Sequence, residues 1–457
     1  MKVSQKLLEK YNVATPRYTS YPPANYFHKE FNDKEVDQAI SLSNIEQPEN
    51  ISLYIHIPFC NKLCFYCGCN TVISRNGKMI DSYIETLKKE IVLLKSKLDP
   101  NRKVSQVHWG GGTPNYLQIE DIESIMNTLY ENFNFIPGAE IAMECHPWHL
   151  TYKYIDCLID LKFNRLSLGV QDFNDKVMNS INRNQSIIPI SELVEYIKAK
   201  DVAVNLDFIY GLPFQTVDSF TETIQKAIEI SPNRLVTFSY AHVPWIKKAQ
   251  RKLEKYNLPD AGEKVKLFEA AYDLLTKSGY KAIGLDHFAK ESDELYIALK
   301  GKTLHRNFQG YCTRETTGQV YALGVSGISQ LESAYLQSTK DVAEYTQLIN
   351  EGKFPIEKAY FLSLEEKITR EIINELMCNL YLSWQALANR FNKPIEELNN
   401  LTKEQNQQLK TFESEGLIIY NKDEIFITET GKFFIRNIAA TFDPKMQNTT
   451  RNFSKAL

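Results

Sequence analysis

The chain has 457 residues, enough for two or three domains and a large apolar core. Its 43% hydrophobic and 24% charged residues are typical of a folded globular protein and argue against a disordered chain. The formal net charge of -3 argues against a nucleic-acid-binding protein, because it provides no overall field that attracts phosphates. With no apolar run of about 18 residues and no apolar signal segment at the start, we expect a cytoplasmic protein that does not bind a membrane.

The first 50 residues precede the regular alternation of strands and helices that follows. The segment TPRYTSYPP, residues 15–23, ends in two consecutive prolines, which favours an extended arm lying across a surface over a helix. Its role could be no more than that of a packed strap. We therefore assign residues 1–50 to an N-terminal arm.

From residue 51 onward, short β-rich segments alternate with amphipathic helical segments. Strands are predicted over residues 51–59, 104–110, 139–147, 165–173, 202–213, 234–244 and 280–288. Helices are predicted over residues 79–98, 119–133, 151–163, 189–200, 219–230 and 263–279. Such alternation indicates a parallel sheet covered by helices, either a barrel or a doubly wound sheet. We assign residues 51–354 to this domain.

The position of the chemically unusual residues favours the barrel. They follow the C-terminal ends of many different strands, where barrel enzymes carry their active sites, whereas a doubly wound sheet would gather them at one switch point. The segment GGGTP, residues 110–114, does not match the glycine pattern of dinucleotide-binding folds, so a nicotinamide cofactor has little support.

Residues 355–457 have a different pattern, mostly helical. The segment 363–383 opens with a capping box, Ser363 to Glu366, and continues with apolar residues at helical spacing. Further helices around a small hairpin resemble a winged-helix arrangement, which often binds DNA. The helix predicted over residues 404–417 has no basic stripe, so a lid or packing domain is favoured.

Four of the eight cysteines lie within the ten residues Cys60 to Cys69. A disulfide framework is not expected in a cytosolic protein, and the C-x3-C-x2-C-x-C spacing differs from the paired C-x2-C pattern of structural zinc. A tight loop after a strand favours three thiolates, Cys60, Cys64 and Cys67, on three corners of an iron–sulfur cubane, with the fourth iron open. Cys69 has no assigned role from spacing alone.

The pattern C-x3-C-x-aromatic-C resembles the radical S-adenosylmethionine (SAM) superfamily. Within that superfamily, the segments PRYTSYP, YIHIPFCNKLCFYCGCN, HWGGGTP, NRLSLGVQDF, NLDFIYGLP, YAHVP, DHFA and LHRNFQGY resemble the oxygen-independent coproporphyrinogen III oxidase family. This resemblance implies an α/β fold, a partial (β/α)6 TIM-like barrel, that binds a [4Fe-4S] cluster and two molecules of SAM. It also implies oxidative decarboxylation of two propionates of coproporphyrinogen III to vinyl groups, giving protoporphyrinogen IX.

The resemblance further implies which residues contact SAM. Tyr54, which points towards the rim, and Tyr66, at an aromatic position that contacts SAM in the family, are two of them. Gly111 and Glu144 are expected at the first SAM. Those expected at the second are Gly112, Thr113, Gln171, Arg183, Asp207 and Ala241. Ile328 corresponds to a contact on the adenine side. Simpler interpretations stay open: packing for the tyrosines and Ile328, a tight turn for the glycines, and a salt bridge between Arg183 and Asp207.

The substrate implied by the resemblance carries four propionates, so its pocket needs cations. Arg17 and Arg306 are our candidates, with Cys69 as a further candidate for a catalytic role. We expect an external one-electron donor such as flavodoxin or ferredoxin, and a monomer. The alternatives are another radical SAM enzyme acting on haem or porphyrin, such as a methyltransferase, or a haem-carrier relative without turnover. The arm and Cys69 favour the decarboxylase.

Overall fold

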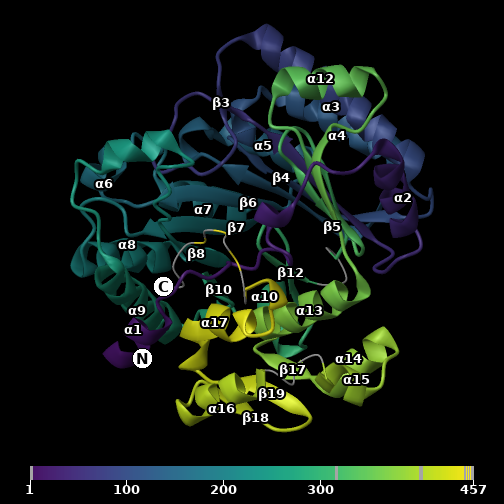
Figure 1. The fold of residues 1–457 in the computed structure, drawn as a ribbon. Helices are drawn as coiled ribbons and strands as arrows, with labels where there is room; N and C mark the ends of the chain where they lie inside the picture. The colour runs from purple at the N-terminus through teal and green to yellow at the C-terminus, as the bar shows by residue number, and fades with distance from the viewer. Residues whose placement is uncertain are drawn as a thin grey trace.

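A computed structural model describes residues 4–313, 318–400, 405–446, 449, 451 and 453. Its centre is a sheet in which six parallel strands follow one another in chain order (Figure 1). These strands are β1 (Ile51–Ile57), β4 (Lys103–Gly111), β5 (Asn134–Cys145), β6 (Arg165–Gln171), β7 (Ala203–Tyr210) and β8 (Arg234–Ser239). Because the order never reverses among them, the sheet has no switch point, and the predicted partial (β/α)6 barrel is confirmed.

Helices connect these strands and cover the outside of the sheet. They are α3 (Gly77–Lys97), α4 (Ile119–Asn132), α5 (Tyr152–Asp160), α6 (Asp175–Ser180), α7 (Ile190–Lys198), α8 (Val217–Ile230) and α9 (Ala261–Lys277). Each of the longer helices buries one apolar stripe; in α3 this stripe includes Tyr83, Leu87, Ile91 and Leu94. These side chains pack on the buried strand residues and form the main core of the protein.

The sheet extends beyond the six parallel strands on both sides. Next to β1 lie β13 (Val320–Leu323), β14 (Ile328–Gln330), β15 (Ala334–Ser338) and β16 (Ile356–Phe361). Strand β16 therefore continues the large sheet past residue 354, our expected end of the barrel domain. Next to β8 lie β10 (His287–Ala289) and β9 (Lys281–Ile283), both antiparallel to their neighbours.

The strand predicted over residues 280–288 is thus divided into two. The chain reverses between β9 and β10 at Gly284, which has a φ of +58°. A side chain there would collide with Tyr311, since a Cβ would lie 1.9 Å from its ring. A turn at this glycine, not a continuous strand, carries the chain back along β8.

The N-terminal arm contains two helices, α1 (Gln5–Tyr11) and α2 (Asp33–Ser43), with an extended segment between them. In Figure 1 this purple segment passes between the barrel and the C-terminal helices. Tyr18 and Tyr21 of the extended segment are almost fully buried in the C-terminal core. The predicted extended arm over 15–23 is therefore confirmed, and it is part of a core.

The C-terminal part begins with α13 (Leu364–Asn374), whose predicted capping box at Ser363 and Glu366 is formed. It continues with α14 (Trp384–Phe391), α15 (Ile395–Asn400), α16 (Asn406–Ser414), α17 (Ile435–Ala440) and a sheet of β17 (Tyr381–Ser383), β19 (Glu424–Ile427) and β18 (Ile418–Tyr420). The predicted helices around a small hairpin are present; Glu404, the first residue of one of them, lies outside the described residues. None of the helices in the described ranges is long and apolar enough to span a bilayer.

Candidate active site

A cavity of about 340 Å³ opens at the C-terminal ends of the parallel strands. We call it the inner cavity. It brings together twelve of the residues singled out in the sequence: Cys60, Cys64, Tyr66, Cys67, Cys69, Gly111, Gly112, Thr113, Glu144, Gln171, Arg183 and Asp207. They come from five different strands and the connections after them, as expected for a barrel whose strand ends meet at one rim.

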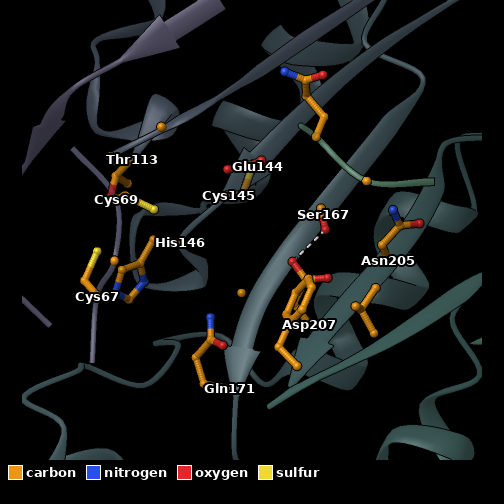
Figure 2. Close-up of a pocket in the computed structure, with 18 of the residues that line it drawn as sticks. Cys67, Cys69, Thr113, Glu144, Cys145, His146, Ser167, Gln171, Asn205 and Asp207 are labelled. Atoms are coloured by element: carbon orange, nitrogen blue, oxygen red, sulfur yellow. Dashed lines mark hydrogen bonds between the residues drawn. The ribbon is translucent and has the colours of Figure 1, made fainter. Parts of the chain in front are cut away.

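The cysteine loop follows β1 and is closed at its base by a short parallel pair, β2 (Phe59–Cys60) with β3 (Val72–Ile73). The thiol of Cys60 is buried and lies 3.2 Å from the Thr113 hydroxyl. Burial raises the pKa of Cys60 to about 11, whereas a hydrogen bond from the Cys69 thiol lowers the pKa of Cys67 to about 6. Figure 2 shows Cys67 and Cys69 on the same side of the cavity.

The three predicted thiol ligands fit a cluster better than a single ion. Within the part of the chain that the structure describes, no three His, Cys, Asp or Glu side chains gather closely enough to hold one metal ion. A cubane needs no such crowding, because each thiolate binds a different iron at a different corner. Cys60, Cys64 and Cys67 lie on one loop around a shared cavity, and Arg183 Nη1 is 3.5 Å from the Cys64 sulfur, where a cation stabilises a thiolate.

The glycine segment after β4 makes room for three side chains of the site. A Cβ at Gly110 would lie 2.9 Å from the Glu144 carboxylate, and one at Gly111, where φ is +115°, would lie 2.7 Å from the His56 ring. At Gly112 it would lie 2.5 Å from the Pro58 carbonyl oxygen and 3.0 Å from the Cys60 sulfur. The three glycines thus allow a strand end to touch the cysteine loop, which is more than a tight turn requires.

Two of the carboxylates that line the inner cavity, Glu144 and Asp207, are those predicted from the sequence. Figure 2 shows Glu144 near the centre and Asp207 farther along, beside Ser167. Asp207 Oδ2 accepts a hydrogen bond of 2.9 Å from the Ser167 hydroxyl. Burial raises the pKa of Asp207 to about 6 despite this hydrogen bond. His108 Nε2 lies 3.1 Å from Glu144 Oε1. These acids suit the ammonium and ribose groups of a nucleoside ligand.

Arg183 and Asp207 do not form the salt bridge that the sequence left open. Among the described residues, Arg183 Nη2 donates to the Gly169 carbonyl at 2.5 Å, and Asp207 is bonded to Ser167 instead. Arg183 Nε is buried without a hydrogen-bond partner there. A buried guanidinium with an unused donor is suited to a ligand carboxylate.

Five of the residues singled out in the sequence do not line the inner cavity. The Tyr54 hydroxyl lies 3.1 Å from His56 Nδ1, and its ring stacks on His108, so Tyr54 lies beside a residue that lines the cavity. Ile328 packs in a small cluster under the arm. Ala241 and Arg17 line a second cavity. Arg306 is buried and donates to the Arg17 carbonyl.

Further polar residues, not predicted from the sequence, lie deeper in the inner cavity. Ser167 and Asn205 line it from β6 and β7, and Glu140, Arg165 and Arg234 form an ion-paired floor. Their signal was present in the sequence: these positions alternate with buried apolar residues along each strand, so they face the barrel interior.

Comparison with known proteins agrees with this geometry. The family model of the radical SAM superfamily matches residues 54–227, and the HemN C-terminal domain model matches residues 362–434. A relative from Synechocystis sp., named oxygen-independent coproporphyrinogen III oxidase, is 41% identical over 99% of this chain and 98% of its own. The protein of that name from Escherichia coli strain K12 is 38% identical with the same coverage.

A solved structure is also similar to this chain over nearly its full length. The coproporphyrinogen III oxidase of Escherichia coli, described as a radical SAM enzyme, superposes with a TM-score of 0.89 and 36% sequence identity. The match covers 97% of this chain and 99% of that one.

The barrel, its cysteine loop and these matches define a radical SAM protein. More particularly, similarity over nearly the full length shows that the chain belongs to the oxygen-independent coproporphyrinogen III oxidase family.

Proposed function

We propose that this protein converts two propionates of coproporphyrinogen III into vinyl groups without oxygen, giving protoporphyrinogen IX. The observation that carries the proposal is the inner cavity, where three cysteines, a glycine-rich strand end and two carboxylates meet in a chain similar throughout to named oxidases of this kind. The near full-length relatives described above are named oxidases, which favours decarboxylation over the alternatives, a haem-directed methyltransferase or a haem carrier.

We assign Cys60, Cys64 and Cys67 to a [4Fe-4S] cluster. The bound cluster would supply one electron to SAM, which breaks a C–S bond and gives methionine and a 5′-deoxyadenosyl radical that removes a hydrogen atom from a propionate. Each conversion to a vinyl group also releases carbon dioxide and one electron, which leaves for an external acceptor. The Arg183 guanidinium beside Cys64 stabilises the negative charge of the Cys64 thiolate.

The remaining residues of the inner cavity hold SAM and exclude water. Glu144 and Asp207 bind ammonium or ribose groups, and the Gly111 to Thr113 backbone lies against the nucleoside. Two molecules of SAM are expected, the second near Gln171 and Arg183. A buried polar group without a hydrogen bond costs free energy. Hydrogen bonds to the ligand would remove that cost for these residues. We propose that Cys69 also lies against a bound group.

The partners follow from the proposed reaction. The enzyme needs an external one-electron donor, such as flavodoxin or ferredoxin, and we propose that it acts as a monomer in the cytoplasm. The tetrapyrrole and SAM are its small-molecule ligands.

Anaerobic reconstitution with iron and sulfide, followed by SAM, a reductant and coproporphyrinogen III, tests the proposal. We expect the amounts of 5′-deoxyadenosine and of vinyl product to increase together. Deoxyadenosine that depends on the substrate but comes without a vinyl product would contradict the decarboxylation and retain the radical chemistry.

The Cys64→Ala variant tests the ligand assignment in the same assay. We expect it to lose both bound iron with acid-labile sulfide and all turnover, because only two protein thiolates would remain. Cys157→Ala is the matched control, since Cys157 lies on α5, away from the inner cavity, and should change neither. A Cys64→Ala protein with a full cluster would show that the ligands lie elsewhere.

A further inference from the structure

A strongly basic segment follows β8 and lies against the cysteine loop. It consists of residues 245–255, includes the short helix η4 (Lys248–Leu253), and is called the basic segment below. It contains five cations and one acid, although the formal net charge of the whole chain is -3. The cations are Lys247, Lys248, Arg251, Lys252 and Lys255. Positive charge is therefore concentrated locally in this part of the chain.

Two hydrogen bonds hold the basic segment against the cysteine loop. Gln250, which is 1% exposed, donates through Nε2 to the Tyr66 carbonyl at 3.0 Å. Lys247 Nζ donates to the Cys69 carbonyl at 2.7 Å. These two carbonyls lie on either side of Cys67 in the chain, which is one of the proposed cluster ligands. The basic segment is therefore fixed directly beside the loop that would hold the cluster.

The cations of the basic segment form no ion pair within the part of the chain that the structure describes. Its single acid, Glu254, lies 3.2 Å from His242 Nε2. Lys248 and Arg251 are exposed, and among the described residues neither side chain makes a hydrogen bond, ion pair or ring contact. The neighbouring residues 58–80, which include the cysteine loop, add three cations and no acid. Exposed charges of one sign in adjacent segments create a local attractive field for an acidic partner.

Two exposed apolar side chains begin the basic segment. Trp245 is 64% exposed and its neighbour Ile246 is 68% exposed. Apolar side chains, tryptophan above all, form the centre of protein–protein interfaces, and charged residues form the rim. A small anion or a nucleic-acid backbone would need only the cations. The combination of cations with Trp245 and Ile246 therefore favours a protein partner.

The proposed reaction requires a protein partner of this kind. One electron has to enter the cluster for each SAM that is cleaved, and it comes from an external donor. Electron transfer slows steeply with distance, so the donor has to dock close to the cysteine loop. A protein seated on the basic segment meets this condition, because Lys247 and Gln250 contact the loop itself. Complementary charge would also speed the encounter of the two proteins.

We propose that the basic segment is the docking surface for the external electron donor, and that this donor is an acidic one-electron carrier protein. In the transfer one electron leaves the carrier and enters the cluster, so the carrier is oxidised, the cluster is reduced and no atom is exchanged. The inference rests on the proposed function for the presence of a cluster that needs an electron.

A double charge reversal, Lys248→Glu with Arg251→Glu, tests the docking surface. The probe is an acidic flavodoxin, and its Kd for the reconstituted protein is measured by surface plasmon resonance. We expect the double variant to raise this Kd about tenfold or more at low ionic strength and by a smaller factor at high salt, because salt screens exposed charges. Iron and sulfide contents should stay unchanged, since neither side chain contacts the cysteine loop through a hydrogen bond or ion pair among the described residues.

The matched control is Lys103→Glu with Lys226→Glu. It reverses the same number of exposed charges, at the first residue of β4 and in the second half of α8, towards the end of the barrel opposite to the cysteine loop. The Kd for flavodoxin should not change in this variant.

A second variant, Ile246→Ser, tests the apolar part of the surface without a change of charge. We expect it to raise the Kd for flavodoxin several-fold, and this increase should persist at high salt because apolar contacts are not screened.

Reduction of the cluster gives a further measurement, made by stopped-flow absorbance. Flavodoxin, kept reduced by its NADPH-dependent reductase and used below its Kd, should reduce the cluster of the Lys248→Glu, Arg251→Glu variant about tenfold or more slowly. Dithionite is a small reductant that needs no docking surface. With dithionite the variant should match the unchanged protein in reduction rate, in turnover and in KM for coproporphyrinogen III.

The possible results separate the two proposals. Equal Kd values for flavodoxin in the two double variants would overturn the docking surface, even if the protein makes vinyl product. A raised KM for coproporphyrinogen III with dithionite would also overturn it, because the cations would then serve the substrate. Weaker flavodoxin binding and slower reduction in the Lys248→Glu, Arg251→Glu variant, in a protein that makes no vinyl product with dithionite, would support the docking surface and overturn the proposed decarboxylation.

Discussion

At the scale of single residues, the site depends on its glycines as much as on its functional side chains. Gly112 shows this most clearly, because a Cβ there would lie 2.5 Å from the Pro58 carbonyl oxygen and 3.0 Å from the Cys60 sulfur. Both neighbours belong to the base of the cysteine loop, which is fixed by pairing of Phe59 with Val72. The loop therefore has little freedom to move away from a larger residue.

We predict that Gly112→Ala displaces Cys60 and lowers retained iron and sulfide at least several-fold after reconstitution. The control is Gly77→Ala, since no atom lies within 4 Å of a Cβ built at Gly77. Iron and acid-labile sulfide analysis measures the effect. Full cluster content in Gly112→Ala would mean that the loop tolerates the shift.

A second residue-scale prediction concerns pH. Burial raises the pKa of Asp207 to about 6, so the carboxylate is protonated below that pH and unable to bind a cationic or hydroxyl group as an anion. If Asp207 binds SAM, the affinity of the protein for SAM should fall as the pH decreases through 6, by up to about tenfold per pH unit. Calorimetric titration with SAM at several pH values measures this.

Two variants locate the pH effect. Ser167→Ala removes the hydrogen bond that lowers the pKa of Asp207, so the midpoint should move to higher pH. Asp207→Asn should bind SAM more weakly and without this pH dependence. An unchanged midpoint in Ser167→Ala would assign the titration to another group.

At the scale of elements, a buried acid joins three segments of the fold. Glu90 on α3 accepts hydrogen bonds of 2.7 Å from the Gly324 backbone N–H after β13 and from the Tyr345 hydroxyl on α12 (Val342–Asn350). Figure 1 shows α12 lying beside α3. Burial raises the pKa of Glu90 to about 7, although both hydrogen bonds lower it. Its ionisation is therefore coupled to folding.

The sign of this coupling gives a prediction. Between the ordinary glutamate pKa and about 7, the folded state holds a proton that the unfolded state has released, so the free energy of unfolding should decrease as the pH rises across this range and level off above 7. The loss from this group is roughly 3 kcal/mol in total. Glu90→Gln should remove that part of the pH dependence in denaturant unfolding, while Glu85→Gln, at an exposed position of the same helix, should retain it. Identical pH curves for the two variants would contradict the assignment.

At the scale of the whole molecule, the N-terminal arm joins the barrel to the C-terminal part. Tyr18 is 2% exposed, packs in the C-terminal core, and donates a hydrogen bond of 3.0 Å to Asp443. The backbone just before Tyr18 accepts hydrogen bonds from both parts: the Arg17 carbonyl from Arg306 next to the barrel, and the Pro16 carbonyl from Arg436 of α17. The two parts of the chain therefore share one set of contacts through the arm.

We predict that Tyr18→Ala costs about 3–5 kcal/mol, because it leaves a cavity and removes one of the hydrogen bonds to the buried Asp443. Amide hydrogen exchange should show faster exchange in α13 and α17, with little change in β4 and β5. Tyr130→Ala, at a 37% exposed position on α4, is the control and should leave all of these rates unchanged. Uniform exchange in both variants would show that the arm only covers the surface.

Much of the inner cavity could be predicted from the sequence, because its parts are local. The cysteines lie in one loop, and the polar residues lie at or near strand ends that a parallel barrel must bring together. The placements of Ala241 and Ile328 were less predictable. Ala241 comes after the end of β8 and lines the second cavity together with Arg17, and Ile328 lies on β14, so neither position depends on the six-strand pattern alone.

The sequence by itself determined the alternation of strands and helices, the loop of thiols and the glycine-rich strand end, since each is a short-range pattern with a local physical cause. Only the tertiary structure decided that Arg17, Lys264 and Arg436 meet in one cavity and that Gly112 touches Cys60. These residues lie far apart in the chain, and their contacts are set by how whole elements pack against each other. Local periodicity does not encode that packing.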